Sequence, residues 1–367
     1  MLNTLTKTKG ILGMNARNLK YIRPYNLKGA KRLADDKLRC KRVLRKGGIP
    51  VPELITKIKT KEELDNFDFS SLPNSFVLKP NFGFGGEGIL VVYGRKKGRS
   101  NVWVKANRDP ITEDDLRNHV RNILDGSFSR ANTPDIAFFE ERIQLLKLFK
   151  PYAYKGIPDI RVIVFNRVPV MAMLRLPTEA SGGTSNVHQG GIAVGIDMAT
   201  GVTTTAIQYN HSVEYAPGKR LLLSGIRIPN WKEILKLAIK SQDVSNLGYL
   251  GADIAIDRNK GPVFMEINAR PGLAIQNANQ DGLLARLQRV EGLRIKTIAQ
   301  GAALAQNLFG GEIEEEIEEL SGKKIIGLIE KVKLTSIDGR AIEVEAKIDT
   351  GADSSSIDIE LARQLGF

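Results

Sequence analysis

Two carboxylates, Asp253 and Glu266, stand in the two arms of one apolar segment, residues 249–273. Turn-forming residues separate the arms, which predicts a β-hairpin. If residues 259–260 form its tip, Asp253 faces Glu266 across the hairpin. A three-residue turn with Gly261 in the left-handed region would shift this pairing by one residue, so the register is an assumption.

The same face of the predicted hairpin carries further polar groups. Side chains alternate along a strand, so Asn268 and Arg270 share the face of Glu266. Carboxylate and amide oxygens suit Mg²⁺, which leaves other coordination positions to phosphate and water. We therefore expect Asp253, Glu266 and Asn268 to form a metal site. The alternative is a solvated hairpin with scattered charges.

A glycine-rich loop lies between two predicted strands, the second of which spans residues 89–93. Glycines let backbone N–H groups close around anionic oxygens, and Lys79 before the loop adds a positive charge. A P-loop or a dinucleotide fingerprint would require a helix after the glycines, and the β-branched residues 89–93 argue against one. The loop therefore predicts phosphate binding by Lys79, Gly83, Gly85 and Gly86. A plain flexible hairpin is the alternative.

The elements that must position these groups alternate along the chain. Strands are expected at residues 76–80, 89–93, 137–143, 159–165 and 168–176, and again from residue 325. Helices are expected from Asp35 or Asp36 to Lys46, and at residues 61–67, 112–124, 231–241 and 282–308. Residues 178–191 form a predicted polar loop, and residues 1–34 a basic, irregular segment.

The composition favours a folded protein with one large or two medium cores, since 42% of its 367 residues are hydrophobic. The sequence has neither an apolar run of membrane-spanning length nor a hydrophobic signal core at its N-terminus. The single cysteine, Cys40, is consistent with a reducing cytoplasm. The net charge is +13, and residues 28–46 are crowded with lysine and arginine. Such a run can bind nucleic acid, phosphates or an acidic peptide, although a solvated helix face is the simpler interpretation.

In their order and spacing, these motifs resemble the ATP-grasp superfamily, and most closely the RimK-like α-L-glutamate ligases. The resemblance covers roughly residues 36–284. It depends on Asp36-Lys37, Lys79 with its glycine loop, Glu140-Glu141-Arg142-Ile143, Asp159-Ile160-Arg161, residues 185–191 (SNVHQGG), Asp253 and residues 265–272 (MEINARPG). It implies an α+β ATP-grasp fold in which two α/β subdomains grip ATP.

The resemblance also implies roles for individual residues. The phosphates of ATP would be contacted by Lys37, Lys79, Gly83, Gly85, Gly86 and Asn186. Adenine and ribose would be held by Glu140, Glu141, Arg142, Ile143 and Asp159. Two Mg²⁺ ions, or Mn²⁺ in their place, would be bound by Asp253, Glu266 and Asn268. The transferred phosphoryl group or the acyl phosphate would be faced by Arg161, Arg175, Arg270, Asn186 and His188.

Two departures from the family pattern concern the substrate. ATP-grasp enzymes usually carry a further domain before the first lysine, and only a short segment precedes Lys37. We therefore expect the acceptor surface to be reduced or supplied otherwise. Where the glutamate ligases have a serine, this chain has Arg270. That difference leaves the carboxylate substrate open.

Near the C-terminus, a predicted strand runs into Asp349-Thr350-Gly351. This resembles the active-site turn of retropepsin-like aspartic peptidases, in the variant found beside RimK-like ligases. Such a peptidase needs a second carboxylate close by, so we expect a partial, β-rich peptidase-like segment; a chance surface turn is the alternative. The expected domains are a basic segment 1–34, a ligase domain 35–310, an acidic linker 311–324 and a partial retropepsin-like segment 325–367.

The leading functional hypothesis is a cytoplasmic, ATP-dependent carboxylate–amine ligase that adds glutamate or a similar amino acid to a peptide or protein. It leaves homo-oligomerisation open. A second hypothesis is a basic nucleic-acid-binding or ribosome-binding protein with a degenerate nucleotide site. The joint presence of Lys79, Asp253, Glu266 and Asn268 argues against degeneracy. A third is a peptidase regulated by a nucleotide domain, which the partial C-terminal segment disfavours.

Overall fold

The computed structural model describes residues 10–96, 98, 101–129, 132–310, 329–336, 339, 341–347 and 355–366. The chain separates into two compact units, Met1–Gly310 and Gly311–Phe367. The first unit contains two main sheets, each with its own hydrophobic core. Within the described residues, no helix is long and apolar enough to cross a membrane.

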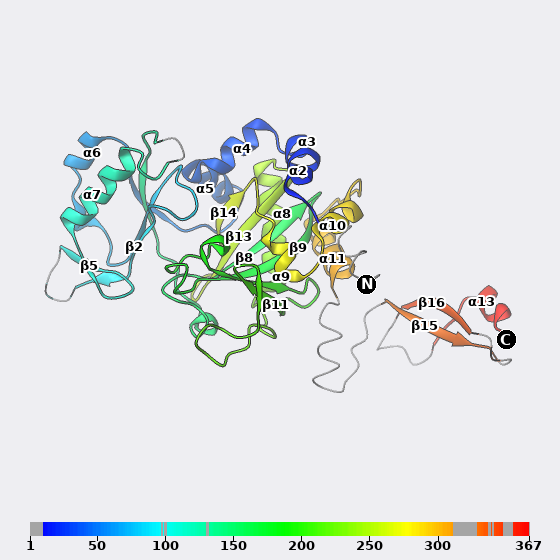
Figure 1. Ribbon diagram of the computed structural model, residues 1–367. Helices are drawn as coiled ribbons and strands as arrows, with labels where there is room; N and C mark the ends of the chain where they lie inside the picture. Colours follow the sequence, from blue (N-terminus) through cyan, green and yellow to red (C-terminus); the bar gives the residue numbers. More distant parts are fainter. Residues whose placement is uncertain are drawn as a thin grey trace. The chain divides into compact units, whose positions relative to one another are not determined.

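The larger sheet has seven antiparallel strands in the order β12-β11-β10-β9-β8-β13-β14 (Figure 1). The strands are β8 Asp159–Phe165, β9 Val168–Leu176, β10 Ile192–Ile196, β11 Thr203–Gln208, β12 His211–Val213, β13 Tyr249–Asp257 and β14 Gly261–Asn268. The expected hairpin of residues 159–165 and 168–176 is confirmed as β8 and β9. The central strands are buried along their whole length because helices pack against the sheet.

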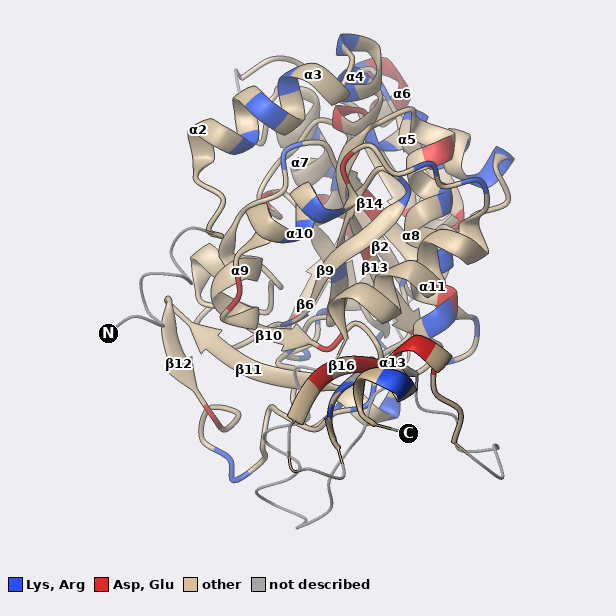
Figure 2. Ribbon diagram, turned by 90° about the vertical axis from the view of Figure 1, so that its right-hand side faces the viewer, with Lys and Arg blue, Asp and Glu red and all other residues tan. Residues whose placement is uncertain are grey.

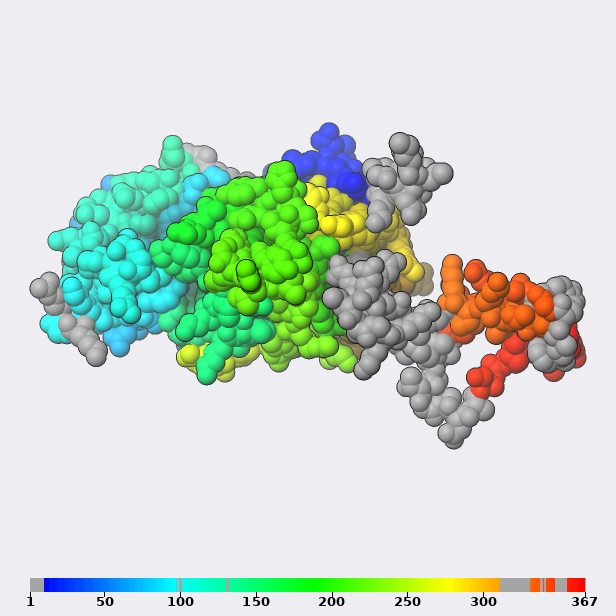
Figure 3. All heavy atoms as spheres, turned by 60° about the horizontal axis from the view of Figure 1, so that its bottom comes forward, coloured from blue at the N-terminus to red at the C-terminus, as the bar shows by residue number. Residues whose placement is uncertain are grey.

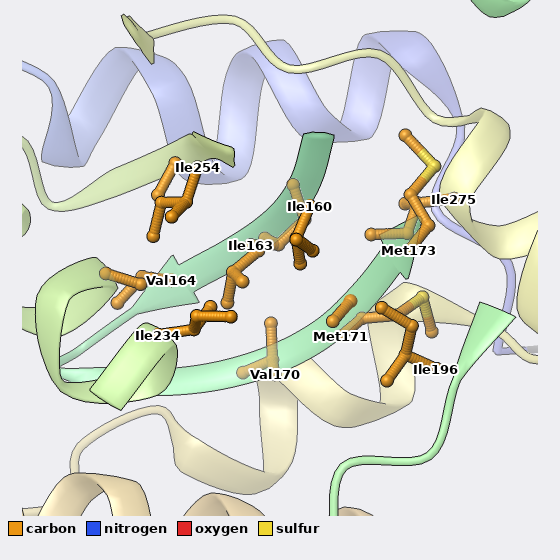
Figure 4. Packing of buried hydrophobic residues seen from close by; sticks show 14 of the residues in the cluster. Ile160, Ile163, Val164, Val170, Met171, Met173, Ile196, Ile234, Ile254 and Ile275 are labelled. Carbon is orange, nitrogen blue, oxygen red and sulfur yellow. The ribbon is translucent and has the colours of Figure 1, made fainter. Parts of the chain in front are cut away.

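The covering helices are α8 Trp231–Ser245, α9 Ala274–Asn279, α10 Leu283–Val290 and α11 Ile298–Phe309. Ile163 of β8, Val170 of β9 and Ile234 of α8 meet in the core (Figure 4). The single helix expected over residues 282–308 is wrong. Gly292 has a φ of +77°, a left-handed conformation that ends a helix, and α11 begins only after Thr297, whose side chain caps it.

The smaller sheet has the order β1-β7-β2-β3 and forms a lobe drawn in blue to cyan in Figure 1 and in space-filling form in Figure 3. Its strands are β1 Leu54–Ile58, β2 Phe76–Pro80, β3 Leu90–Val92 and β7 Ala137–Glu140. A further sheet of three strands follows β3 in the sequence: β4 Gly94–Arg95, β5 Val102–Val104 and β6 Pro110–Thr112. The same part of the chain contains helices α6 Lys61–Asp65 and α7 Glu113–Leu124 and the 3₁₀ turn η2 Phe69–Ser71. Phe76, Trp103 and Phe139 pack together in its core.

The expectation that residues 1–34 are irregular is wrong for the described part of that segment. It folds into α2 Met14–Ala16, a π-helical turn η1 Arg17–Ile22, α3 Arg23–Tyr25 and α4 Lys28–Asp35. Tyr21 is buried with its ring edge-on to Phe165, and Pro24 is tolerated because it lies in the first turn of α3. The helix that follows, α5 Lys37–Lys46, is capped by Asp36, as expected.

The hairpin of β13 and β14 contains two irregularities that cancel. Its turn is the three-residue type, with Asp257 opposite Gly261, and Gly261 has a φ of +76°. A bulge then shifts the register by one residue between Asp253 and Ile254. Asp253 therefore faces Glu266, as predicted, although the turn that the prediction assumed does not form.

The second unit contains strands β15 Ile329–Thr335 and β16 Ala341–Lys347, followed by helix α13 Ile359–Gln364. The two strands pair antiparallel, with Val332 opposite Val344 and Lys333 opposite Glu343. Strands were expected in this region, and these two are present. Asp349, the predicted peptidase-like residue, lies outside the described residues.

Two short 3₁₀ turns complete the first unit. The turn η3 Lys147–Phe149 follows β7, and η4 Val187–Gln189 lies within the expected loop of residues 178–191.

Candidate functional site

One cavity of about 1100 Å³ lies between the larger and the smaller sheet of the first unit. Its walls include every site residue predicted upstream of the C-terminal segment. These are Lys37, Lys79, Gly83, Gly85, Gly86, Glu140, Glu141, Arg142, Ile143, Asp159, Arg161, Arg175, Asn186, His188, Asp253, Glu266, Asn268 and Arg270. Residues that are far apart in sequence are therefore brought to one site by the fold.

A network of two arginines and two aspartates forms one wall. The antiparallel register sets Arg161 opposite Asp253, and Arg175 opposite Asp159. Arg161 donates to both oxygens of Asp253, at 2.7 and 2.6 Å, and Arg175 joins Asp253 at 2.8 Å to Asp159 at 2.6 Å. The bidentate geometry is the strong form of the arginine–carboxylate pair.

The surroundings of this network shift the pKa values of its two carboxyl groups in opposite directions. Burial raises the pKa of Asp159 to about 6, and the neighbouring Asp253 adds to this effect while Arg175 opposes it. Burial also acts on Asp253, but Arg161 and Arg175 outweigh it and lower its pKa. Asp253 is therefore held ionised by its two arginines.

Three lysines, Lys37, Lys41 and Lys79, also line the cavity. Lys79 pairs with the buried Glu140 at 2.6 Å, and Lys41 donates to the other carboxylate oxygen. Lys37 donates to backbone carbonyls of the glycine loop, including that of Gly83. Glu140 stays a predicted nucleotide contact, and its side chain forms ion pairs with two lysines.

Burial controls the charge of these groups. It lowers the pKa of Lys41 to about 8, with Glu140 opposing the shift. Burial also lowers the pKa of Lys37, and Glu266 opposes the effect. For Glu140 itself, burial is outweighed by Lys41 and Lys79, so its pKa is lowered. Lys41 and Lys79 thus share one buried carboxylate while Lys37 donates to backbone carbonyls, so these three lysines outnumber the carboxylate beside them.

Lys41 was not predicted as a site residue. A signal was present in the sequence, because Lys37 and Lys41 are four residues apart in a predicted helix and therefore lie on the same face. Asp35 was considered only as a helix cap, and it also lines the cavity. It forms a bidentate pair with Arg270, at 2.8 and 3.2 Å, and both side chains are partly exposed.

Two loops meet over the cavity. In the glycine loop, Gly85 and Gly86 have φ values of +65° and +87°, which glycine adopts without strain. The amide of Asn186 reaches the carbonyl of Gly85 at 3.4 Å. Asn186 also caps the turn η4 by accepting from the His188 backbone N–H. Phosphate-sized anions placed here would face backbone N–H groups and the lysines together.

The segment after β7 and the adjacent strands form an apolar slot. Ile143, Ala255 and Val263 make a small buried cluster, with Ile157 and Met265 packed against it. The backbone N–H of Glu141 donates to Glu53 at 2.8 Å, which fixes the segment at the end of β7. Ile143, Ile157 and Met265 of this cluster line the cavity, and an apolar wall beside backbone polar groups suits a purine base.

The predicted metal ligands fit a divalent cation in part. Glu266 is exposed to the cavity and forms no ion pair within the described part of the chain. The oxygen of Asn268 accepts from the Arg270 N–H at 2.9 Å, and a carbonyl oxygen has a second lone pair. Asp253 gives both oxygens to arginines. Among the described residues, no group of three or more His, Cys, Asp or Glu side chains gathers as a metal site.

Comparisons with solved structures give distant similarity. The chain is 13% identical to the ATP-grasp ligase PsnB with its minimal precursor, with a TM-score of 0.36, covering 77% of this chain and 62% of that one. It is 16% identical to biotin carboxylase from Campylobacter jejuni, with a TM-score of 0.44, covering 79% of this chain and 54% of that one. It is 15% identical to D-alanine–D-alanine ligase from Bacillus anthracis, with a TM-score of 0.37, covering 71% of this chain and 66% of that one. The chain thus spans less than two thirds of PsnB.

No curated protein matches the chain. The family model for sugar-transfer-associated ATP-grasp proteins matches residues 16–292. The match includes the N-terminal helices as well as both sheets and the cavity. It confirms the ATP-grasp fold that the motifs predicted, and it names neither a glutamate ligase nor a retropepsin-like segment. Since this match extends over most of the sequence, the chain belongs to the sugar-transfer-associated ATP-grasp family.

Proposed function

We propose that this protein is an ATP-dependent carboxylate–amine ligase that works through an acyl phosphate. The observation that carries the proposal is the convergence of an apolar slot, a lysine and glycine anion site and an arginine network in one cavity. In the proposed reaction, a substrate carboxylate attacks the γ-phosphorus of ATP and ADP leaves. An amine then attacks the acyl carbon, phosphate leaves, and the amine loses a proton.

The proposed nucleotide site uses both sheets. Adenine occupies the slot beside Ile143 and Met265, with the backbone after Glu140 at its edge and Asp159 toward the ribose. Lys37, Lys41 and Lys79 hold the phosphates under the glycine loop. Glu266 and Asn268 would bind Mg²⁺, which would neutralise phosphate charge. Asp253 would join them if an arginine released one of the Asp253 oxygens. Two such ions are proposed from the family resemblance.

The proposed transfer site lies at the arginine end of the cavity. Arg161 and Arg175 are held in place by buried carboxylates, so they present fixed positive charge where the phosphoryl group transfers. Asn186, His188 and Arg270 line the same region. No protein nucleophile is required. Cys40 is buried, and burial raises its pKa to about 12, so it is not a thiolate at neutral pH.

The proposed substrates come from the resemblance of the motifs to RimK-like ligases. They are glutamate or a similar amino acid and a peptide or protein acceptor in the cytoplasm. PsnB itself has been solved in complex with a precursor peptide. The resemblance of the C-terminal segment to retropepsin-like peptidases is proposed on its sequence alone, and self-association remains open.

A substrate screen tests this function. Purified protein with ATP and Mg²⁺ is supplied with single amino acids, short peptides and pairs of both, and ADP release and product masses are measured. The expected result is ADP release that needs a carboxylate and an amine together, with a product lighter than their sum by one water. Glu266→Gln is the matched inactive control.

Two outcomes would contradict the proposal. One is ADP release that no carboxylate stimulates. The other is ADP release that nucleic acid stimulates and amino acids do not, which would favour the nucleic-acid hypothesis.

A further inference from the structure

The N-terminal helices present an unusual surface. Residues 1–34 contain no Asp or Glu, although 41 acidic residues occur in the chain. The described part of this segment is folded and is part of the first unit. Its ribbon carries blue segments and no red along α2 and α3 (Figure 2). The uniform positive charge is therefore held on a defined surface.

Large aliphatic side chains are exposed on these helices and on the residues that flank them. Their exposed fractions are 52% for Ile11, 63% for Met14, 60% for Leu19 and 69% for Leu27. No other aliphatic residue among the large hydrophobics described in the first unit is as exposed. Single exposed apolar residues are normal, but here four of them occur in one segment that also carries exposed basic residues.

Basic side chains are interleaved with these apolar ones. Lys20, Arg23, Lys28 and Arg32 are all exposed. None of the four forms an ion pair with an acidic group in the described part of the chain. We use the term N-terminal surface for these four residues together with Ile11, Met14, Leu19 and Leu27.

The surface is rigidly attached to the protein body. Arg17 is buried and donates to the carbonyl of Pro271 at 2.7 Å, and Asn26 donates to the carbonyls of Tyr249 and Ala269. The backbone of Leu12 exchanges hydrogen bonds with the side chain of Gln276. Because the opposite faces of these helices are occupied, the exposed residues cannot turn inward to bury themselves.

One acidic residue borders the surface from another element. Tyr25 donates to Glu291 at 2.9 Å. The segment that follows Glu291 presents Leu293, which is 39% exposed, and the exposed Arg294. This neighbouring segment therefore repeats the combination of apolar and basic side chains.

We propose that the N-terminal surface docks on an anionic lipid membrane. Basic residues attract anionic headgroups, and interleaved aliphatic side chains gain by entering the boundary with the acyl chains. A nucleic acid would use the charges, but aliphatic side chains offer no ring on which bases can stack. The combination therefore fits a lipid surface better than a polyanion. This proposal is independent of the reaction catalysed.

The cavity lies close to this surface along the chain. Asp35, the last residue of α4, pairs with Arg270 in the cavity wall, and α5 supplies Lys37 and Lys41 to it. Membrane docking through α4 would therefore bring the cavity near the lipid. Docking and catalysis remain separable in the test, because the N-terminal surface shares no residue with the cavity.

Vesicle sedimentation of the full chain tests the proposal. The probes are vesicles of phosphatidylcholine alone and of an equal mixture of phosphatidylcholine and phosphatidylglycerol. The wild type should bind only the mixed vesicles. Lys20→Gln with Lys28→Gln should weaken this binding by about fivefold for each lysine removed. Leu19→Ser with Leu27→Ser should weaken it by about tenfold for each leucine.

The control variant removes the same charge elsewhere. Lys147→Gln with Lys150→Gln changes two exposed lysines next to η3 and should bind mixed vesicles like the wild type. Nucleotide binding, measured for every variant, confirms the fold.

Three results would overturn the proposal. They are equal binding to both vesicle types, unchanged binding of the leucine variant, and a leucine-dependent dimer that forms without vesicles and does not sediment with them. Competition by duplex DNA that depends on the lysines and not on the leucines would assign the surface to nucleic acid instead.

Discussion

Replacing Glu140 by glutamine removes the only carboxylate that the described residues place between Lys41 and Lys79. The change is nearly isosteric, so it tests charge and not packing. Glu140 is 2% exposed, and the side chain of Lys41 is 12% exposed. Breaking a buried ion pair by removing one partner costs about 3–5 kcal/mol, because the remaining charge is left buried without compensation. Glu140→Gln should lower the free energy of unfolding by about that amount.

The pKa of Lys41 supports this magnitude. Even with Glu140 present, burial lowers that pKa from 10.5 to about 8, a difference that corresponds to roughly 3 kcal/mol. Without Glu140 the pKa should fall further. The unfolded state then binds more protons than the folded state over a wider pH range, so the stability of the variant rises with pH. Since the pKa of Glu140 is lowered, its own contribution is complete above about pH 5.

The neighbouring Glu141 provides a matched control. It pairs with Lys260 at 2.6 Å, but both side chains are more than one third exposed, and such surface pairs contribute at most about 1 kcal/mol. Urea unfolding of wild type, Glu140→Gln and Glu141→Gln is followed at pH 7 and pH 9. The fluorescence of Trp103 and Trp231 reports on both cores of the first unit. Equal losses in the two variants, or a Glu140→Gln deficit that grows with pH, would refute the reasoning.

Four further predictions concern the site and the tail. Glu266→Gln should reduce Mg²⁺-dependent ADP release by orders of magnitude while changing stability little, since Glu266 is exposed; near-normal turnover would reject its role. Nucleotide affinity should fall as pH rises through about 8, where Lys41 loses its proton in the free protein, whereas Lys41→Arg should remove this dependence; calorimetric titration of wild type and variant measures both. ATP with Mg²⁺ should protect the exposed Phe82 and Phe84 from chymotrypsin, because phosphate contacts order the glycine loop, and equal cleavage without ligand would contradict a phosphate cover. Deleting residues 325–367 should leave ADP release largely intact, since the cavity is lined only by residues of the first unit within the described chain; loss of turnover in a folded deletion variant would assign the tail to the site.

Local patterns predicted the elements that carry the site. The apolar runs at residues 159–165 and 168–176 predicted β8 and β9 to the residue, since both strands are buried almost throughout. The opposition of Asp253 and Glu266 was also predicted correctly. The turn assumed for it was wrong, because the alternative with a left-handed Gly261 forms, and the bulge that restores the pairing could not be placed from the hydrophobic pattern alone.

Other features depend on tertiary contacts that no local pattern records. The N-terminal helices were missed because their glycines and Pro24 suggested irregular chain, whereas burial of Tyr21 and Ile22 against the body holds them in place. The ion pairs of Glu140 were also not predicted. Its motif indicated a nucleotide contact, which stays a prediction, and only the fold shows that Lys41 and Lys79 reach the same carboxylate.

The bulge in β14 also affects which side chains of this strand face the cavity. In a regular strand, Met265 and Glu266 would point to opposite faces. Because the bulge adds one residue opposite Asp253, both side chains line the same cavity, Met265 beside the apolar cluster and Glu266 beside the charged wall. Neighbouring positions can thereby serve the base and the phosphate ends of one ligand. In the proposed nucleotide site, the number of residues in this strand, and not only their identity, determines which positions reach the base and which reach the phosphates.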